Sequence, residues 1–318
     1  MGDRKKGFKM TEIKRKAKGG KMKWFVFGFL AVIVLYLLIQ GIRCMIGLRK
    51  SQEKLRAYEV STVTLSYGAM TYVDVGEGDV ILSVHGIFGG YDQAYDSVQN
   101  RVTKNRVLAP SRFGYLGSDV RGEGTPKEQA AAFEELLDHL NIDRVFVLAT
   151  SAGGTPAIRF ALDYPERVKG LILYCSAMPV NEKPDTYLEY QAPPEPLLSD
   201  YAMYLISPLM PILMGMPAST VETILPVADR KVGVVLDGKH TNPDMERNYN
   251  DYPIEELKVP VLILHSEDDT LASFEKVEKV KHRFPNLTLV TFPDGGHMMT
   301  GHGMEIDRAL DDFSNTNR

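Results

Sequence analysis

The chain has 318 residues, of which 44% are hydrophobic and 25% are charged, and this composition is typical of a globular protein with one large core. A formal net charge of -4 gives no reason to expect a nucleic-acid partner. The two cysteines, Cys44 and Cys175, are too few for a disulfide framework, and neither lies in a metal-ligand spacing.

The N-terminal segment is basic and is followed by an apolar run. Residues 1–23 hold ten lysines or arginines, whereas residues 24–42 hold no charge. As a helix, the apolar run would span roughly 28 Å at about 1.5 Å per residue, close to the thickness of a bilayer's hydrocarbon core. We predict a basic tail over residues 1–23 and a transmembrane helix over residues 24–42 that anchors the protein in a membrane.

A cleaved signal peptide is the alternative to this anchor. The basic region and the apolar run exceed the usual lengths, and residues 41–44 lack an Ala-x-Ala cleavage site, so we favour the anchor. Ten basic residues precede the span and five follow it within a similar length. The positive-inside rule then predicts a single-pass protein with a cytoplasmic N-terminus and an extracytoplasmic domain. Residues 43–59 are predicted to be a linker, whose second half is either a polar connection or a juxtamembrane helix.

Residues 60–318 are predicted to form one α/β domain. Two alternating segments, residues 60–66 and 70–75, predict an opening hairpin. Residues 80–84 are typical of a buried strand, and they lead into a His-Gly-Ile-Phe-Gly-Gly loop over residues 85–90. Glycines at the carboxyl end of a strand let backbone N–H groups turn toward a ligand in the crevice of an open α/β sheet.

The strongest signal lies in residues 145–162. An apolar β-branched run predicts a buried strand, and the small and apolar residues from Ala152 onward predict a helix, so Ser151 lies at the join. A serine on a sharp strand-to-helix turn is exposed to substrate, provided that its neighbours are small. Those neighbours are Ala149, Ala152, Gly153 and Gly154. Ser151 is therefore a candidate nucleophile, with a plain strand-to-helix turn as the alternative.

The regular alternation of strands and helices lapses over residues 179–252. This stretch is rich in proline and methionine, and residues 201–217 are strongly apolar but too short and too broken by proline for a second span. We predict that residues 179–252 form a helical lid over the site. Most of its apolar residues would pack the lid onto the core, and an acyl-chain tunnel or a surface that contacts the bilayer are the functional alternatives.

The last two predicted strands, residues 260–264 and 287–292, are each followed by a polar loop. The first loop carries adjacent acids, and the second is rich in glycine and carries His297. Five of the seven histidines fall on predicted helices, in the lid or in strand-end motifs: His85, His139, His240, His265 and His282. His297 and His302 remain as candidate bases.

Taken together, these segments resemble the α/β-hydrolase family, in its esterase- and lipase-like branch. The resemblance covers about residues 60–313, and its serine, acid and histidine occur in the order expected of this fold. The chain departs from the family pattern at Ala149, where the elbow motif has glycine, and at Ser266, where the acid-bearing loop has glycine. The resemblance implies an α/β-hydrolase fold, with a mostly parallel doubly wound sheet and a helical lid, here preceded by one transmembrane helix.

The resemblance also implies roles for individual residues. Ser151 would be the nucleophile, His297 its base and Asp269 the acid that orients the base, with the adjacent Asp268 as the alternative acid. The backbone N–H groups of Ile87 and Ala152 would form the oxyanion hole. No metal or organic cofactor is implied.

The expected function is that of a membrane-anchored serine hydrolase that cleaves carboxylic esters of lipophilic acids through an acyl-enzyme. Its partners would be a small-molecule or lipid ester and the membrane itself. A carbon–carbon bond hydrolase, a peptidase and a cofactor-free perhydrolase are the alternatives within the fold. From another class, the alternative is a membrane-tethered binding module without enzymatic activity.

Overall fold

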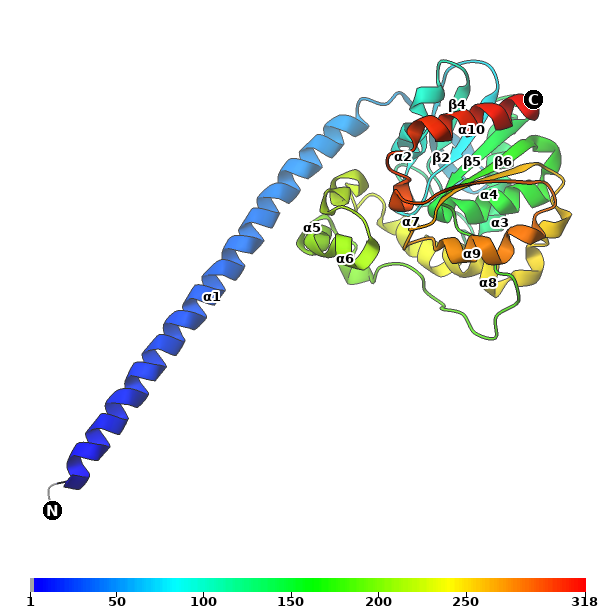
Figure 1. Ribbon diagram of the computed structural model, residues 1–318. Helices are drawn as coiled ribbons and strands as arrows, with labels where there is room; N and C mark the ends of the chain where they lie inside the picture. Colours follow the sequence, from blue (N-terminus) through cyan, green and yellow to red (C-terminus); the bar gives the residue numbers. More distant parts are fainter. Residues whose placement is uncertain (1–2) are drawn as a thin grey trace.

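The computed structural model describes the backbone of residues 3–318 and the side chains of residues 22–212 and 215–318. The predicted basic tail therefore lies almost entirely outside the described side chains. Figure 1 shows one long helix, α1 (Asp3–Leu55), that leads into a mixed α/β domain.

One eight-stranded sheet forms the centre of the domain, in the strand order β1-β2-β4-β3-β5-β6-β7-β8. The strands are β1 (Val60–Leu65), β2 (Gly68–Val75), β3 (Val80–Val84), β4 (Arg106–Pro110), β5 (Val145–Thr150), β6 (Val168–Tyr174), β7 (Val261–Ser266) and β8 (Leu287–Phe292). Strand β2 runs antiparallel to β1 and β4, and every pairing among β3 to β8 is parallel. The predicted opening hairpin and mostly parallel sheet are thus confirmed.

Helices cover both faces of this sheet (Figure 1). One face carries α3 (Pro126–His139), α4 (Gly154–Asp163) and α9 (Phe274–Val280), and the other carries α2 (Tyr91–Asp96) and α10 (Gly303–Thr316). Strand β5 contributes side chains to the hydrophobic core on each face of the sheet, because side chains along a strand alternate between the two faces. Val145 and Val147 pack with α3 and α4, whereas Phe146 and Leu148 pack with α10. This is the doubly wound arrangement that the sequence predicts.

The predicted lid lies between β6 and β7 and is helical. Its helices are α5 (Asp200–Ile206), α6 (Met210–Met214), α7 (Lys231–Leu236) and α8 (Asn242–Arg247). They are short because prolines recur, and both Pro208 and Pro211 stand in the first turn of a new helical segment. In Figure 1, α5 and α6 lie beside α1, whereas α7 and α8 lie along the domain.

The predicted linker over residues 43–59 is helical as far as Leu55, in agreement with the juxtamembrane helix that is the alternative for its second half. Helix α1 continues without a break to Leu55, so only residues 56–59 connect it to β1. The cause is tertiary packing, since Cys44, Gly47 and Ser51 are buried on one face of the helix. The Ser51 hydroxyl also donates to the Leu225 carbonyl of the lid at 2.7 Å.

Helix α1 contains the candidate membrane span. Its portion Met22–Leu55 is long and apolar enough to cross a bilayer, and only 6% of its most apolar window is buried. A signal sequence can have the same length and composition, so the span and its orientation stay predictions.

Candidate active site

Ser151 directly follows β5 and opens the turn into α4. Its φ of 53° lies in the left-handed region, which a sharp strand-to-helix turn imposes on a non-glycine residue. The turn also needs small neighbours: a Cβ on Gly153 would lie 2.5 Å from the Val84 carbonyl oxygen, and one on Gly86 would lie 2.9 Å from the Ser151 Cβ. The strand and the loop therefore close tightly around this serine.

The Ser151 hydroxyl is left available by its surroundings. The residue is half-buried, and its carbonyl accepts from the Ala177 amide at 2.8 Å and from the Ser176 hydroxyl at 3.1 Å. Within the described chain, the hydroxyl itself makes no hydrogen bond, to His297 or to any other group. The backbone is thus fixed while the reactive atom remains unpaired.

Asp269 and His297 are in contact at the ends of β7 and β8. Asp269 Oδ2 lies 2.8 Å from His297 Nδ1, and Oδ1 accepts from the Leu271 and Ala272 amides at 2.8 and 3.0 Å. Burial acts to raise the pKa of Asp269, but His297 and the two amides outweigh it and lower that pKa. The carboxylate is therefore ionised and accepts from Nδ1–H, which leaves Nε2 as a proton acceptor.

The neighbouring Asp268 does not contact His297. Its Oδ1 accepts from the Ser266 hydroxyl at 2.6 Å and from the Gly296 amide at 2.8 Å, so it fixes the loop that carries His297. Those two hydrogen bonds, that of Ser266 first, lower the pKa of Asp268. Ser266, the departure from the family pattern, thus supports the acid-bearing loop. The second candidate base, His302, instead lies 2.8 Å from Asp294.

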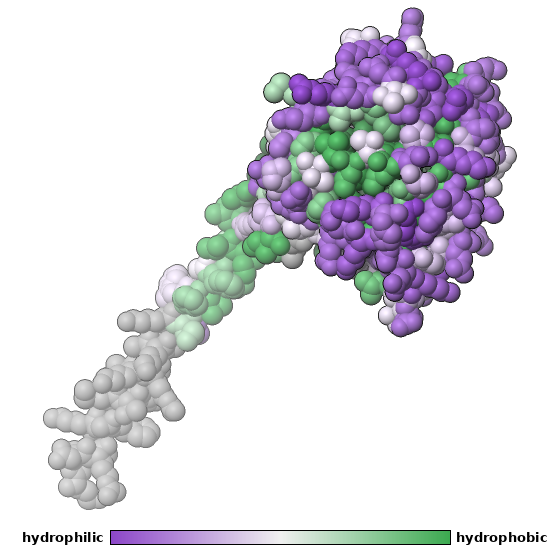
Figure 2. Space-filling view, turned by 45° about the vertical axis from the view of Figure 1, so that its right-hand side comes forward, coloured by the Kyte–Doolittle hydropathy of each residue, from purple (hydrophilic) through white to green (hydrophobic). Residues whose placement is uncertain are grey.

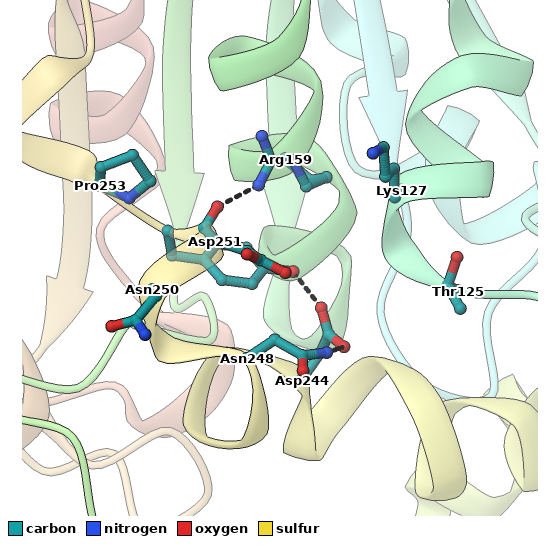
Figure 3. A pocket seen from close by; sticks show the side chains of 9 residues that line it. Thr125, Lys127, Arg159, Asp244, Asn248, Asn250, Asp251 and Pro253 are labelled. Carbon is teal, nitrogen blue, oxygen red and sulfur yellow. Dashed lines mark hydrogen bonds between the residues drawn. The ribbon is translucent and has the colours of Figure 1, made fainter.

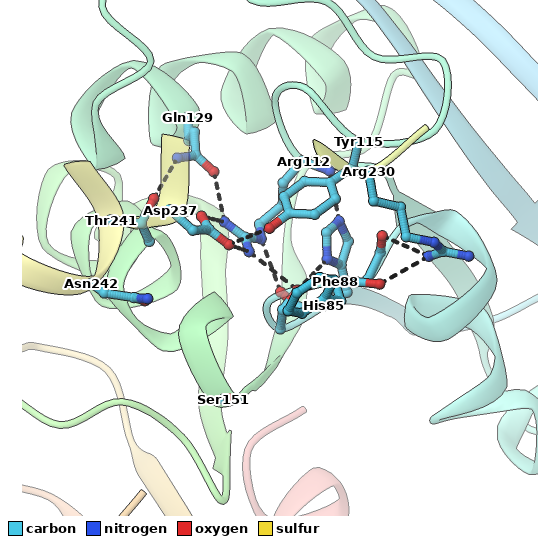
Figure 4. Close-up of polar contacts among 12 residues, drawn as sticks. His85, Phe88, Arg112, Tyr115, Gln129, Ser151, Arg230, Asp237, Thr241 and Asn242 are labelled. Carbon is cyan, nitrogen blue, oxygen red and sulfur yellow. Dashed lines mark hydrogen bonds and ion pairs between the residues drawn. The ribbon is translucent and has the colours of Figure 1, made fainter. Parts of the chain in front are cut away.

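Arg112 holds the first half of the 85–90 loop, and sequence reasoning did not single it out. Its Nε donates to the His85 carbonyl at 2.9 Å and its Nη2 to the Gly86 carbonyl at 3.3 Å. The same guanidinium forms a two-pronged ion pair with Asp237 of the lid, at 2.7 and 2.5 Å, and both side chains are fully buried (Figure 4). Tyr115 completes the group by donating to Asp237 at 2.6 Å.

Arg230 of the lid holds the second half of the loop (Figure 4). Its Nη1 donates to the Phe88 carbonyl at 3.1 Å and to the Gly89 carbonyl at 2.7 Å. It also pairs with Asp92, at 3.0 and 2.8 Å. No local pattern singles these arginines out, because Arg112 lies in the loop after β4 and Arg230 lies between two other charged residues, Asp229 and Lys231.

The two predicted oxyanion donors are unoccupied by protein acceptors. Neither the Ile87 amide nor the Ala152 amide donates to an acceptor in the part of the chain that the structure describes. Both N–H groups flank the Ser151 turn, because Gly86 touches the serine and Ala152 follows it. Their role as oxyanion donors stays a prediction.

His85 is a structural residue and not a base. Its ring is fully buried, with Nδ1 2.7 Å from the Gly86 carbonyl and Nε2 accepting from the Arg112 amide at 2.9 Å. Burial, followed by the positive charge of Arg112, holds the pKa of His85 well below 6.5. Both ring nitrogens are occupied, so the histidine supports the loop as a neutral group.

Three buried side chains lie close enough together to hold a metal ion by distance alone. Ligand atoms of Cys175, His265 and Asp269 lie within 4.8 Å of one another, and all three residues are buried. Burial raises the pKa of the Cys175 thiol to about 12, and Asp269 is already bonded to His297. The thiol is therefore protonated at neutral pH, a form that binds metal poorly.

A cavity of about 450 Å³ lies away from these residues, between the ends of α3, α4 and α8 (Figure 3). Two of its charged side chains are already paired: Arg159 with Asp163 and the Asp251 carbonyl, and Asp244 with Tyr252 and Asn248. None of the predicted site residues lines it. We assign no chemistry to this cavity.

The family of the chain follows from a comparison with known proteins. A family model described as the alpha/beta hydrolase family matches residues 81–309, which include the serine turn, the acid loop and the histidine loop. The chain belongs to the alpha/beta hydrolase family. The family implies a hydrolase, and the esterase- or lipase-like branch stays a proposal.

Several sequences resemble parts of this alpha/beta hydrolase. An uncharacterized hydrolase, YcgS, from Bacillus subtilis is 38% identical over 118 residues, which are 36% of this chain and 40% of that protein. A 2-hydroxy-6-oxo-6-phenylhexa-2,4-dienoate hydrolase from Burkholderia cepacia is 34% identical over 106 residues, which are 31% of this chain and 37% of that protein. The chain thus matches about two fifths of the length of these relatives.

Solved structures share the fold of this alpha/beta hydrolase. A thermophilic esterase from Thermogutta terrifontis has a TM-score of 0.64 at 19% identity, covering 81% of this chain and 98% of its own. A meta-cleavage product hydrolase from Pseudomonas fluorescens IP01 has a TM-score of 0.62 at 19% identity, with the same coverage. At such identities the likeness shows the fold alone.

The adjacent acids provide a matched test of the site. We expect Asp269→Asn to slow the labelling of Ser151 by a fluorophosphonate on the order of 10³-fold or more, because the base loses its orienting carboxylate. Asp268→Asn leaves the Asp269–His297 contact in place, and we expect a loss under about tenfold. The labelling rate of the detergent-solubilised full chain measures both, and equal losses would show that the structure does not distinguish the two acids.

The neutral state of His85 predicts a pH dependence of stability. The unfolded chain binds a proton on His85 near pH 6.5, whereas the folded chain does not, so His85 costs stability as the pH falls below 6.5. The expected slope is about 1.4 kcal/mol per pH unit for this one group. Urea unfolding of the detergent-solubilised chain at pH 7.5 and 5.5 should therefore show a smaller acid loss for His85→Asn than for the unaltered protein. Identical losses would mean that His85 is protonated in the folded state.

Proposed function

We propose that the protein is a membrane-anchored serine hydrolase that cleaves lipophilic carboxylic esters. The family supports hydrolysis, and the observation that carries the proposal is the 2.8 Å contact of Asp269 with His297, at the sheet edge where Ser151 opens its turn. An ionised acid, an oriented imidazole and an unpaired hydroxyl are the three groups that acyl transfer by serine requires.

The proposed reaction proceeds in two acyl transfers. Ser151 Oγ attacks the ester carbonyl carbon while His297 Nε2 takes its proton, and the Ile87 and Ala152 amides receive the oxyanion. The C–O bond of the ester then breaks, and the alcohol leaves with the proton from His297. A water molecule gives a proton to His297 and attacks the acyl-enzyme, which releases the acid and restores Ser151.

The surroundings of the 85–90 loop favour a lipophilic acyl group. Ile87 and Phe88 pack into an apolar cluster with lid residues, among them Met203 and Met210. Methionine side chains adapt to apolar groups of different shape. An acyl chain on the carbonyl that Ser151 attacks would therefore find apolar neighbours beside the proposed oxyanion hole.

The exposed surface of α1 supports the anchor. Its apolar side chains are solvent-exposed over almost the whole segment from Trp24 (79%) to Ile42 (52%). A continuous apolar surface of this length needs a covering phase, and a bilayer provides one of matching thickness. With the flanking charges, this gives a cytoplasmic N-terminus and an extracytoplasmic catalytic domain.

A carbon–carbon bond hydrolase is the second candidate, since two partial relatives are named 2-hydroxy-6-oxo-6-phenylhexa-2,4-dienoate hydrolases. Such a substrate carries a carboxylate that needs a cation. The buried arginines beside the 85–90 loop, Arg112 and Arg230, are each already paired with an aspartate. These two arginines are therefore not free to bind such a carboxylate, which supports the ester as the first candidate.

Hydrolysis of p-nitrophenyl esters tests the proposal. We expect the full chain in detergent to cleave a long-chain ester faster than the acetate, and Ser151→Ala and His297→Ala each to reduce the rate by at least about 10³-fold. His302→Ala is the matched control, because this histidine pairs with Asp294, and it should stay within about twofold of the unaltered protein.

Other outcomes separate the alternatives. Turnover of a 2-hydroxy-6-oxo-dienoate without ester hydrolysis would favour the carbon–carbon bond hydrolase. Loss of activity in His302→Ala to the same degree as in His297→Ala would contradict the assignment of the base. An unaltered protein that neither hydrolyses esters nor reacts with a fluorophosphonate would favour the binding module.

A further inference from the structure

The lid contacts α1 inside the apolar segment of that helix. The Tyr36 hydroxyl donates to the Leu205 carbonyl at 2.7 Å, and the Tyr201 hydroxyl donates to the Leu37 carbonyl at 3.0 Å. Tyr36 and Leu37 precede Ile42, the end of the proposed span, by roughly 8 Å along the helix at about 1.5 Å per residue. Helix α5 therefore reaches down to the last turns of the apolar segment.

The contact between the lid and α1 continues along one face of α1 toward the C-terminal end of that helix, and it fixes the lid in place. Gln40, Cys44, Gly47 and Ser51 are buried, and their spacing of three and four residues places them on one side of the helix. A Cβ on Gly47 would overlap the hydroxyl of Tyr204 in α5, so the two helices approach each other closely. The packing of α5 against α1 thus fixes the position of the lid along the axis of the proposed span.

The part of the lid next to α5 ends in an exposed apolar tip, residues 207–212. Leu209 is 49% exposed and Ile212 is 83% exposed, and Pro208 and Pro211 are exposed beside them. The chain carries no charge from residue 201 to residue 221. In Figure 2 the apolar surface of α1 continues up to the edge of the domain. A monomer rarely leaves such a patch in water.

We propose that this lid tip inserts into the interfacial region of the bilayer that α1 crosses. The inference rests on the proposed membrane anchor and deepens it. The contacts of α5 with Tyr36 and Leu37 lie roughly 8 Å inside the proposed end of the span, which is within the range at which amphipathic helices lie in the headgroup and acyl boundary. Met45 and Ile46, which follow the proposed end of the span, are also exposed and apolar, so the apolar surface of α1 extends past Ile42.

The lid tip also communicates with the candidate active site. Met210, at its centre, belongs to the same buried cluster as Tyr204 of α5, Cys44 of α1 and Phe88 of the 85–90 loop. Apolar contacts therefore run from the proposed lipid level to the loop beside Ser151. An ester dissolved in the bilayer would reach the lid without passing through water, so the lid tip selects substrates that partition into membranes.

Tryptophan quenching by lipids brominated near the ester end of their acyl chains tests this insertion. The chain has a single tryptophan, Trp24, which reports on the anchor itself. In a Trp24→Phe background, Ile212→Trp places a probe on the lid tip, and Met304→Trp is the matched control. Met304 is 84% exposed and lies in α10, which follows the last strand and is not part of the lid.

The full chain is reconstituted into vesicles with and without the brominated lipid. We expect quenching on the order of twofold for the unaltered protein and for Ile212→Trp, and almost none for Met304→Trp, because bromine quenches only at short range. Both substituted positions are highly exposed, so the fold should tolerate the larger side chain.

Each other outcome overturns the inference in a recognisable way. Quenching of Trp24 without quenching of the Ile212→Trp probe would leave the anchor and refute the insertion. Absence of quenching at both positions would refute the anchor together with the insertion. Equal quenching in Met304→Trp would mean that the domain adsorbs without using its lid tip. Hydrolysis of a water-soluble ester by the same samples reports separately on the proposed catalytic function.

Discussion

Two buried arginines hold the loop beside Ser151, and the assembly of the candidate site depends on them. Arg112 comes from the core and pairs with Asp237 of the lid, whereas Arg230 comes from the lid and pairs with Asp92 of the core. A guanidinium out of water is tolerated only when its charge is paired and its N–H groups find acceptors, here the carbonyls of the 85–90 loop. The lid and the loop must therefore fold together, and the lid is a part of the site.

Local signals predicted the framework and the serine turn, and the resemblance to the α/β-hydrolase family supplied the roles of Asp269 and His297. Buried parallel strands consist of short runs of apolar, β-branched residues, and a strand-to-helix turn that exposes a serine requires small neighbouring residues. Ser151, Asp269 and His297 each follow such a strand, so the sequence places them at one sheet edge. The choice between Asp268 and Asp269 was open, because adjacent residues share the same local pattern. In the structure the Gly296 amide and the Ser266 hydroxyl engage Asp268, whereas Asp269 contacts His297.

Pairings between distant residues were beyond the sequence. Arg112 and Asp237 are 125 positions apart, and Tyr201 and Leu37 are 164 positions apart. The helical continuation of α1 over residues 43–50 was missed for the same reason, whereas a juxtamembrane helix was one expectation for the residues that follow. Its buried face is made of small residues such as Gly47 and Ser51, and the charges stand on its exposed face, so local composition alone resembles a polar linker. The packing that makes it a helix comes from the lid.

The central claim is that the lid orders the 85–90 loop for catalysis through the Arg112–Asp237 pair. A double variant, Arg112→Met with Asp237→Leu, removes both charges together and avoids a buried unpaired ion. The kinetics of ester hydrolysis by the folded full-length variant test the claim most directly. We predict a fall in kcat on the order of 10²-fold with little change in KM, because a loosened oxyanion donor weakens only the transition state. An unchanged kcat would contradict the account.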